Sequence, residues 1–359
     1  AYEIYGNDSG PLPSGYRRLN LANDDLKWET TTQNNIGIDF AAFTSKLNLS
    51  FDYYLKNTTD ILLSPPYIAT IGSGGGRWIN GASMRNWGWE LLVSYADNAG
   101  EVNYQVSVNA ARNTNRITYL PEEAVGGYPG NGNDQIILGR PINSFFGWVA
   151  DGLFQNQAEV DGHAIQPGKA PGRLRYRDIN NDGRIDADDR TWIGVNEPDI
   201  MGGIDFQFSW KNIDFSMLWR AEFGRMVNNT TIKSFTHFFG FFGGQNYGVH
   251  VLDSWSPTNP TSNIPAISAA DANNEQRFSS YFVENASYIK LGSLELGYSL
   301  PTSLIRNSRI VNARVYLQGQ NLWTIAGFGK NPYRGFDPQL PNLDYQVPTS
   351  CSLGINLTF

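Results

Sequence analysis

The connections between strands constrain this chain more than any other feature, because short turns alternate with long loops along its whole length. The strands are marked by apolar residues at every second position, and the segment KLNLSFDYYLK at 46–56 is an example. Successive side chains point to opposite faces of a strand, so one face of this segment is apolar and the other is polar. The apolar face carries Leu47, Leu49, Phe51, Tyr53 and Leu55, and the polar face carries Asn48, Ser50, Asp52, Tyr54 and Lys56.

The same period of two predicts nine strands in the chain. They cover residues 33–43, 46–56, 84–96, 101–114, 201–210, 212–224, 287–299, 310–323 and 349–359. The connections FTSK, DNAG, WKN and PTSLIRNSR are short, whereas the connections 57–83, 115–200, 225–286 and 324–348 are long. Two segments within 115–200, ITYL and QIIL, stay open as additional strands.

This alternation favours an all-β, antiparallel transmembrane barrel. Outer-membrane barrels have short periplasmic turns and longer extracellular loops, with an apolar outer face and a polar lumen. A soluble sandwich would bury the apolar face against a second sheet, but it has no reason to gather all its long loops at one end. Long loops without regular structure are also unusual in compact domains.

The composition agrees with a membrane barrel better than with a helical membrane protein. The chain is 41% hydrophobic, 13% aromatic and 17% charged, and its mean hydropathy is −0.37. Soluble proteins usually have about 25% charged residues. No run approaches the roughly 18 apolar residues of a spanning helix. The same composition fits a large secreted β protein, and the net charge of −7 argues against nucleic acid as a partner.

The strand count predicts that part of the barrel lies outside this chain. Bacterial barrels have an even number of strands with both ends periplasmic. If Phe359 ends the last strand on the periplasmic side, residues 1–31 form an extracellular loop that at least one earlier strand must precede. We therefore expect residues 1–359 to be the C-terminal part of a larger barrel, with open edges that need partner strands. A barrel or secreted protein also needs a signal peptide, and AYEIYGNDSG at the start is not one.

The segment DINNDGRIDADD at 178–189 predicts a calcium site, because its oxygen-bearing residues have the spacing of an EF-hand loop. Gly183 would supply the sharp turn in the middle of this loop. The expected ligands are Asp178, Asn180, Asp182, the backbone carbonyl of Arg184, Asp186 and Asp189. The ion would be structural and would hold the long 115–200 connection in place. The alternative is an Asx-rich turn that closes a surface loop without a metal.

Catalytic motifs are absent from the sequence. The chain has three histidines, His163, His237 and His250, and no HExxH, CxxC or GxSxG pattern. The glycine-rich segment GSGGGR at 72–77 follows a proline-rich loop rather than a strand, so we interpret it as a loop tip and not as a phosphate cradle. We therefore expect that the protein is not an enzyme.

Aromatic residues are abundant in the long loops, and two interpretations of them stay open. They can pack loop against loop, or they can contact a sugar or a partner protein. The run FFGFFGG at 238–244 suits a partner best. The aromatic set is Trp148, Phe154, Phe235, Phe238, Phe239, Phe241, Phe242, Tyr247 and Trp255.

Several segments in order resemble the C-terminal half of SusC/RagA-type TonB-dependent outer-membrane transporters. They are LKWETTTQNNIGIDF at 26–40, NWGWELLVSY at 86–95, INSFFGWVADGLFQ at 142–155, RYRDINNDGRIDADDRTWIG at 175–194, WSPTNPTSNIPAI at 255–267, NASYIKLGSLELGYSLP at 285–301, ARVYLQGQNLWTIAGF at 313–328 and SLGINLTF at 352–359. The resemblance covers essentially the whole chain, and it rests on features other than the strand pattern.

This resemblance implies a 22-stranded barrel in the outer membrane of a Gram-negative cell, of which this chain forms part of the wall and the extracellular loops. It implies a plug and a TonB box, which this chain does not contain, and coupling to TonB through that missing part. It also implies a SusD-like lipoprotein lid, the lipid bilayer as surroundings, and an oligosaccharide, or in some cases a peptide, as cargo.

Three classes of protein therefore compete. The first is a TonB-dependent importer, most simply of oligosaccharides. The second is a secreted, calcium-stabilised β protein that binds glycans without transport. The third is an outer-membrane enzyme, against which the lack of a convergent catalytic set argues. Solubility separates the first two, because a barrel part needs detergent or its partner strands and a secreted protein does not.

Overall fold

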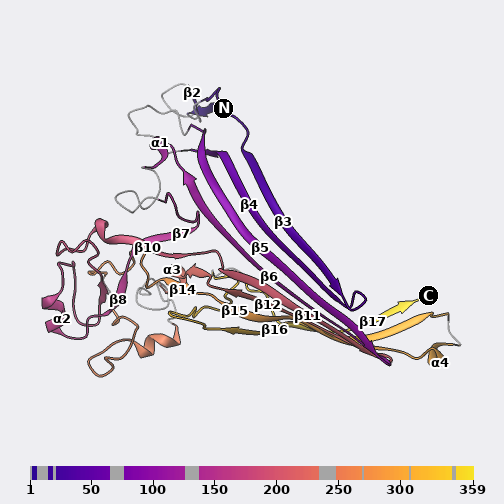
Figure 1. Ribbon diagram of the computed structural model, residues 1–359. Coiled ribbons are helices and arrows are strands. Elements are labelled where there is room, and N and C mark those ends of the chain that lie inside the picture. Colours follow the sequence, from indigo (N-terminus) through magenta and orange to yellow (C-terminus); the bar gives the residue numbers. More distant parts are fainter. Residues whose placement is uncertain are drawn as a thin grey trace. The chain divides into compact units, whose positions relative to one another are not determined.

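The computed structural model describes residues 2–5, 15–18, 22–64, 77–125, 137–233, 248–268, 271–306, 309–341 and 345–359. Its main element is one nine-stranded sheet, in which each long strand lies beside the next long strand along the chain (Figure 1). The strands are β3 (Thr30–Ala42), β4 (Leu47–Leu63), β5 (Ile79–Ala99), β6 (Val102–Tyr119), β11 (Ile200–Trp210), β12 (Ile213–Phe223), β15 (Tyr288–Ser299), β16 (Asn312–Ala326) and β17 (Ser350–Thr358). The predicted all-β antiparallel fold is confirmed.

The largest differences from the predicted boundaries are at β4 and β5, which reach far into the connection predicted at 57–83. β4 ends at Leu63 and β5 begins at Ile79. The sequence does not alternate there in the way it does at 46–56. Backbone pairing does not need an apolar face once a strand has passed the part of a barrel that faces hydrocarbon. The strands therefore continue after their hydropathy pattern has faded.

The two segments left open as strands are not separate strands of the sheet in the described part of the chain. ITYL lies at the end of β6, which runs to Tyr119. In QIIL, the residues 137–138 form a turn, and the residues 135–136 lie outside the described residues.

The chain divides into two compact units. The first is Ala1–Asn35, Tyr54–Gly88 and Thr114–Ser144, and the second is Ile36–Tyr53, Trp89–Asn113 and Phe145–Phe359. In the first unit β1 (Tyr2–Tyr5) pairs with β2 (Gly15–Arg18), α1 (Glu122–Val125) follows β6, and the guanidinium of Arg116 lies 5.5 Å from the ring centroid of Trp87. The second unit carries the candidate site.

The long connections of the second unit fold into a loop assembly, which we define as the described residues of 145–199, 225–286 and 327–349. Three short pairings organise it: β7 (Ser144–Trp148) with β10 (Arg190–Val195), β8 (Ala150–Leu153) with β9 (Leu174–Tyr176), and β13 (Met226–Asn228) with β14 (Val283–Asn285). Short helices join them: α2 (Gln157–Gly162), η2 (Ala187–Asp189), α3 (Thr230–Lys233) and η4 (Val249–Asp253). A further helix, α4 (Thr302–Ile305), follows β15.

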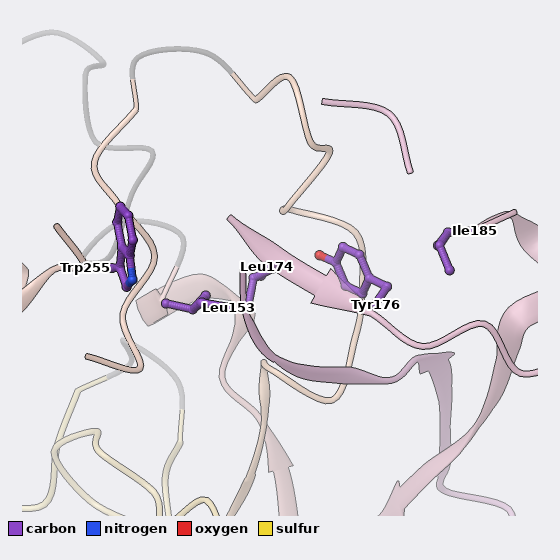
Figure 2. Packing of buried hydrophobic residues seen from close by; sticks show 5 residues of the cluster. All are labelled: Leu153, Leu174, Tyr176, Ile185 and Trp255. Carbon is purple, nitrogen blue, oxygen red and sulfur yellow. The ribbon is translucent and has the colours of Figure 1, made fainter. Parts of the chain in front are cut away.

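The loop assembly has its own hydrophobic core, shown in Figure 2. Its members come from segments far apart in the sequence and are Leu153, Leu174, Tyr176, Ile185 and Trp255. Trp148 packs against this cluster, and Phe154 is fully buried. The packing interpretation of the loop aromatics is confirmed for these tryptophans and Phe154. The run FFGFFGG, together with Phe235 and Tyr247, lies outside the described residues, as do residues 72–76 of the glycine-rich segment.

In the described part of the chain, no helix has both the length and the apolar character that are needed to cross a bilayer.

Candidate functional site

The register of the sheet separates an apolar face from a polar face. Phe206 on β11 lies opposite Val106 on β6 and Met217 on β12, so apolar residues share one side across three strands. The apolar face continues through β15 and β16 to β17, and the paired residues Leu317 on β16 and Leu353 on β17 are 56% and 75% exposed. A continuous band of exposed apolar side chains is unfavourable in water, and it is the expected outer surface of a strand that crosses hydrocarbon.

The polar face carries a charged cluster near the short turns. Arg314 on β16 donates from Nε to Asp214 Oδ1 on β12 over 3.0 Å and from Nη2 to Glu295 Oε1 on β15 over 2.6 Å. Gly297 on β15 lets these groups approach, since a Cβ there would lie 2.5 Å from an oxygen of Asp214. Three neighbouring strands are therefore tied by one guanidinium on the side opposite the apolar band.

A second charged cluster joins the polar face to the loop assembly. Lys290 on β15 is 3% exposed, and its Nζ donates to Asp337 Oδ2 over 2.9 Å and to Gln339 Oε1 over 2.8 Å. The hydroxyl of Tyr288 donates to Glu222 Oε1 over 3.0 Å. The connection between β16 and β17 is therefore fixed to the polar face by a buried ammonium.

A hollow of about 750 Å³ lies over this part of the sheet. Its polar lining includes Asp52, Glu90, Arg220 and Glu222, and Gln339 contributes from the loop assembly. A surface with both charge signs and amide groups binds polar oligomers by hydrogen bonds rather than by apolar burial. The polar face of the sheet, with this hollow, is the candidate functional site.

Buried polar groups hold the loop assembly in one arrangement. Gln166 donates to the carbonyl of Leu174 over 2.7 Å and accepts from the amide of Tyr176 over 3.1 Å, so one side chain satisfies the free edge of β9. Glu275, which is 0% exposed, accepts from Leu174 N over 2.7 Å and from Arg173 Nη1 over 3.0 Å. Burial raises the pKa of the Glu275 carboxyl, and the neighbouring Arg173 opposes that rise.

The predicted calcium ligands lie together in one tight loop. Asp178 Oδ2 accepts from Gly183 N over 2.8 Å, Asn180 Oδ1 accepts from Asp182 N over 3.0 Å, and Asp182 Oδ1 accepts from Arg184 N over 2.8 Å. Gly183 has a φ of 83°, a left-handed conformation that favours glycine, at the place where the sequence predicts a sharp turn. These hydrogen bonds are those of the Asx-rich turn that the sequence left open as the alternative.

The second half of this loop is closed by its last two carboxylates. Asp186 Oδ1 accepts from Asp188 N over 2.9 Å, and Asp189, which is 0% exposed, accepts from Ile179 N over 2.7 Å and Asp186 N over 2.8 Å. The indole of Trp148 donates to the Asp186 carbonyl over 2.7 Å. In the described chain, no three Asp, Glu, His or Cys side chains converge as a metal-binding group.

The sequence did not single out the charged residues of the polar face. The strands themselves were predicted correctly, and their polar positions include Arg314, Glu295 and Lys290. The signal for these residues was a charge in an otherwise neutral alternating segment. Asp214 is 100 residues from Arg314 along the chain, and Asp337 and Gln339 are 47 and 49 residues from Lys290. No local sequence pattern reveals contacts over such separations.

The fold and the two faces together define a class of protein: the sheet is part of the wall of a large antiparallel barrel that crosses a membrane. No protein-family model matches the chain. Curated relatives do match, among them the TonB-dependent receptor P3 of Formosa agariphila, 30% identical over 366 residues that cover 96% of this chain and 36% of the relative. The TonB-dependent receptor SusC of Bacteroides thetaiotaomicron is 26% identical over 347 residues, covering 94% of this chain and 32% of SusC.

A solved structure agrees with these relatives. The RagAB peptide transporter superposes with a TM-score of 0.75 at 26% sequence identity, covering 100% of this chain and 38% of the transporter chain. The chain is therefore a homologue of SusC/RagA-type TonB-dependent receptors over nearly its whole length, which confirms the resemblance that the sequence predicted. It spans about a third of the length of these relatives.

Proposed function

We propose that the chain forms part of the barrel wall and the extracellular loops of a TonB-dependent importer in the outer membrane of a Gram-negative cell. The observation that carries this proposal is the division of one sheet into an exposed apolar face and a polar face with paired charges. The apolar face would contact lipid and the polar face would line the lumen. The names of the relatives, receptors and transporters, agree with a role that is not enzymatic.

The partners in this proposal follow from the same homology. The remaining barrel strands would complete the wall, a plug would close the lumen, and TonB would act through that plug. A SusD-like lipoprotein would cover the loop side, which agrees with the RagAB complex as the structural neighbour. The cargo would be a short polar oligomer, an oligosaccharide as the sequence resemblance suggests or a peptide as in RagAB.

Uptake by whole cells tests this function. The full-length gene is expressed in a Gram-negative host with and without an active TonB, and uptake of fluorescently labelled oligosaccharides and peptides is measured. We expect accumulation that depends on both the gene and TonB. A protein that is secreted and soluble, with no TonB-dependent uptake of either oligomer class, would contradict the proposal and favour the glycan-binding alternative.

We also propose that the loop at 178–189 holds a structural calcium ion through Asp178, Asn180, Asp182, Arg184, Asp186 and Asp189. The order of the oxygens and the left-handed Gly183 support this, since calcium takes six to eight oxygen ligands from such loops. The backbone amides that now bond to Asp178 and Asp182 are compatible with carboxylates whose remaining lone pairs bind a cation. The ion would stabilise the loop assembly and take no part in transport.

A further inference from the structure

A cavity of about 600 Å³ lies inside the loop assembly, apart from the hollow on the sheet. Residues of β8, β9, β10, β13, α3 and β14 line it, together with the segment 330–334. Its described lining contains three cationic side chains, Lys233, Lys330 and Arg334, and no carboxylate. This local charge is opposite to the net charge of −7 of the whole chain.

One of the three cations is already neutralised. Lys233 Nζ lies 2.8 Å from Glu284 Oε1, donates to the carbonyl of Tyr281, and sits 4.3 Å from the centroid of the Tyr281 ring. Glu284 is 0% exposed, and its other oxygen accepts from Asn229 Nδ2 over 2.6 Å. The same oxygen also accepts from the backbone amide of Arg334 over 3.3 Å. Glu284 thus offsets one of the three cations, and the cavity keeps a net positive charge.

The other two cations stand on a segment that the structure holds rigidly. The amide of Asn285 donates to Asn331 O over 2.8 Å, and the amide of Tyr333 donates to Asn285 O over 2.9 Å. Asn331 Nδ2 adds a bond to Val283 O over 2.7 Å. Lys330 and Arg334 therefore flank a stretch that is bonded to β14, and their backbone is pre-organised before any ligand arrives.

Lys233 and Arg334 lie close enough for the charge of one to affect the other. Burial lowers the pKa of the Lys233 ammonium, Glu284 opposes this, and the charge of Arg334 lowers the pKa further. A bound anion would relieve this repulsion, and a guanidinium matches the geometry of a carboxylate.

The rest of the lining decides which anion fits. Its apolar part comprises Ala150, Leu153, Leu174, Ile193, Met226, Val283 and Pro332, and its uncharged polar part comprises Asn263, Ser280, Tyr281 and Asn331. A sugar has hydroxyls on every side, so those against the apolar part would lose hydrogen-bond partners, which is costly, whereas the few polar groups suffice for the backbone amide of a peptide. An aliphatic side chain would instead be buried there, next to the carboxylate that the cations bind.

We propose that this cavity captures the C-terminal carboxylate of a peptide with an apolar last residue, through Lys330 and Arg334, with the side chain against the aliphatic wall. The inference rests on the proposed function, because it names the cargo class that the importer selects with its loops. It does not depend on the transport step, since binding to the purified protein is measured without TonB.

Equilibrium binding to the full-length protein in detergent tests this proposal. The probes are N-acetyl-Leu-Leu as the free acid, the same dipeptide as its C-terminal amide, and a glucuronate-containing oligosaccharide. We expect the acid to bind about tenfold tighter than the amide or more, as for a charge-assisted contact. Equal affinity of acid and amide, or binding of the glucuronate oligosaccharide in preference to the peptide, would overturn the proposal.

Charge-removing variants locate the binding in the cavity. Lys330→Ala combined with Arg334→Ala should abolish the preference for the acid and leave the affinity for the amide unchanged, whereas Arg334→Lys should keep most of the preference. The matched control, Lys211→Ala with Arg306→Ala, removes the same charge from exposed positions on short turns and should change nothing. If the control lowers the affinity for the acid as much as the cavity variant, the carboxylate binds elsewhere. Failure of TonB-dependent uptake alone would contradict the proposed function and leave this binding result intact.

Discussion

At the scale of single residues, the two faces of the sheet differ by one step along a strand. Val106 lies on the apolar face opposite Phe206, and Ser107 lies on the polar face opposite Asp205. The two neighbours have nearly the same place along β6 and differ in the medium that their side chains meet. They are therefore a matched pair for testing which side faces lipid.

We predict that Val106→Arg impairs assembly and that Ser107→Arg is mild. An arginine on the lipid face of a barrel near the bilayer midplane costs about 2–4 kcal/mol, whereas Ser107→Arg places a cation opposite the carboxylate of Asp205 on the polar face. The folded fraction in a heat-modifiability gel of the full-length protein measures both. Equal loss of the folded band in the two variants would argue against a membrane barrel.

His163 is the residue of the loop assembly whose protonation should matter near neutral pH. Its ring lies edge-on to Phe154, with centroids 5.1 Å apart, and its Nε2 is buried without a hydrogen-bond partner in the described part of the chain. Burial lowers the pKa of His163 below its usual value of 6.5, and this effect, with the charge of Lys169, outweighs hydrogen bonds of the ring with Tyr176 and Gln166. The folded loops therefore take up a proton less readily than the unfolded loops do.

This pKa shift predicts that acid loosens the loop assembly. In the pH window between the lowered pKa of the folded state and 6.5, the unfolded state binds more protons than the folded state. The stability of the folded loops is therefore complete above this window and falls as the pH falls through it. Proteolysis within 145–199 should be faster at about pH 5.5 than at about pH 7.5. His163→Gln should flatten this dependence and His250→Gln should keep it. A pH dependence unchanged by His163→Gln would show that another group is responsible.

At the scale of elements, a single carboxylate of the acidic loop at 178–189 can determine whether the long connection around it stays ordered. The loop 178–189 is bonded to β7 through Trp148, and Ile165 exchanges backbone bonds with Gly183 and Ile185 over 2.8 and 3.0 Å. Ile185 is also part of the hydrophobic core of the loop assembly. Disorder in the acidic loop should therefore spread to its neighbours.

We predict that Asp182→Ala and a calcium chelator each increase protease cleavage between Asp151 and Asp199. Either change leaves the remaining carboxylates close together without a cation to offset their repulsion. Limited proteolysis of the full-length protein measures the effect, and Asp161→Ala on the exposed side of α2 is the control variant. If neither the substitution nor the chelator changes the cleavage rate, the loop is a turn without a metal.

The elements that the sequence predicted well are those whose periodicity reflects two different surroundings. All nine long strands were predicted, because an apolar face on one side and a polar face on the other impose a period of two. The short strands β7 to β10 have three to six residues and lie in loops with neither surrounding, so no period develops. The contact of Arg173 with Glu275 spans 102 residues and leaves no local trace. The acidic loop was visible because all its groups are neighbours in sequence.

At the scale of the whole molecule, the sheet has two free edges. β17 and β3 are the outermost strands, and each has one strand neighbour in the described part of the chain. In hydrocarbon, every unpaired backbone amide and carbonyl costs several kcal/mol, so spanning sheets exist as closed barrels. The relatives, of which this chain matches about a third, are long enough to supply the remaining strands.

We predict that the chain expressed alone aggregates or is degraded, and that co-expression of the remaining barrel with its plug rescues it. The open edges at β3 and β17 would pair with other chains or remain unsatisfied in lipid, and the neighbouring strands would remove both problems. The amount of folded, membrane-inserted protein, measured by fractionation and heat modifiability, is the readout. The control is co-expression with an unrelated barrel of similar size, which should not rescue. Recovery of the chain alone as a stable, monodisperse monomer without detergent would overturn the barrel assignment, because the apolar face would then have found cover within the chain itself.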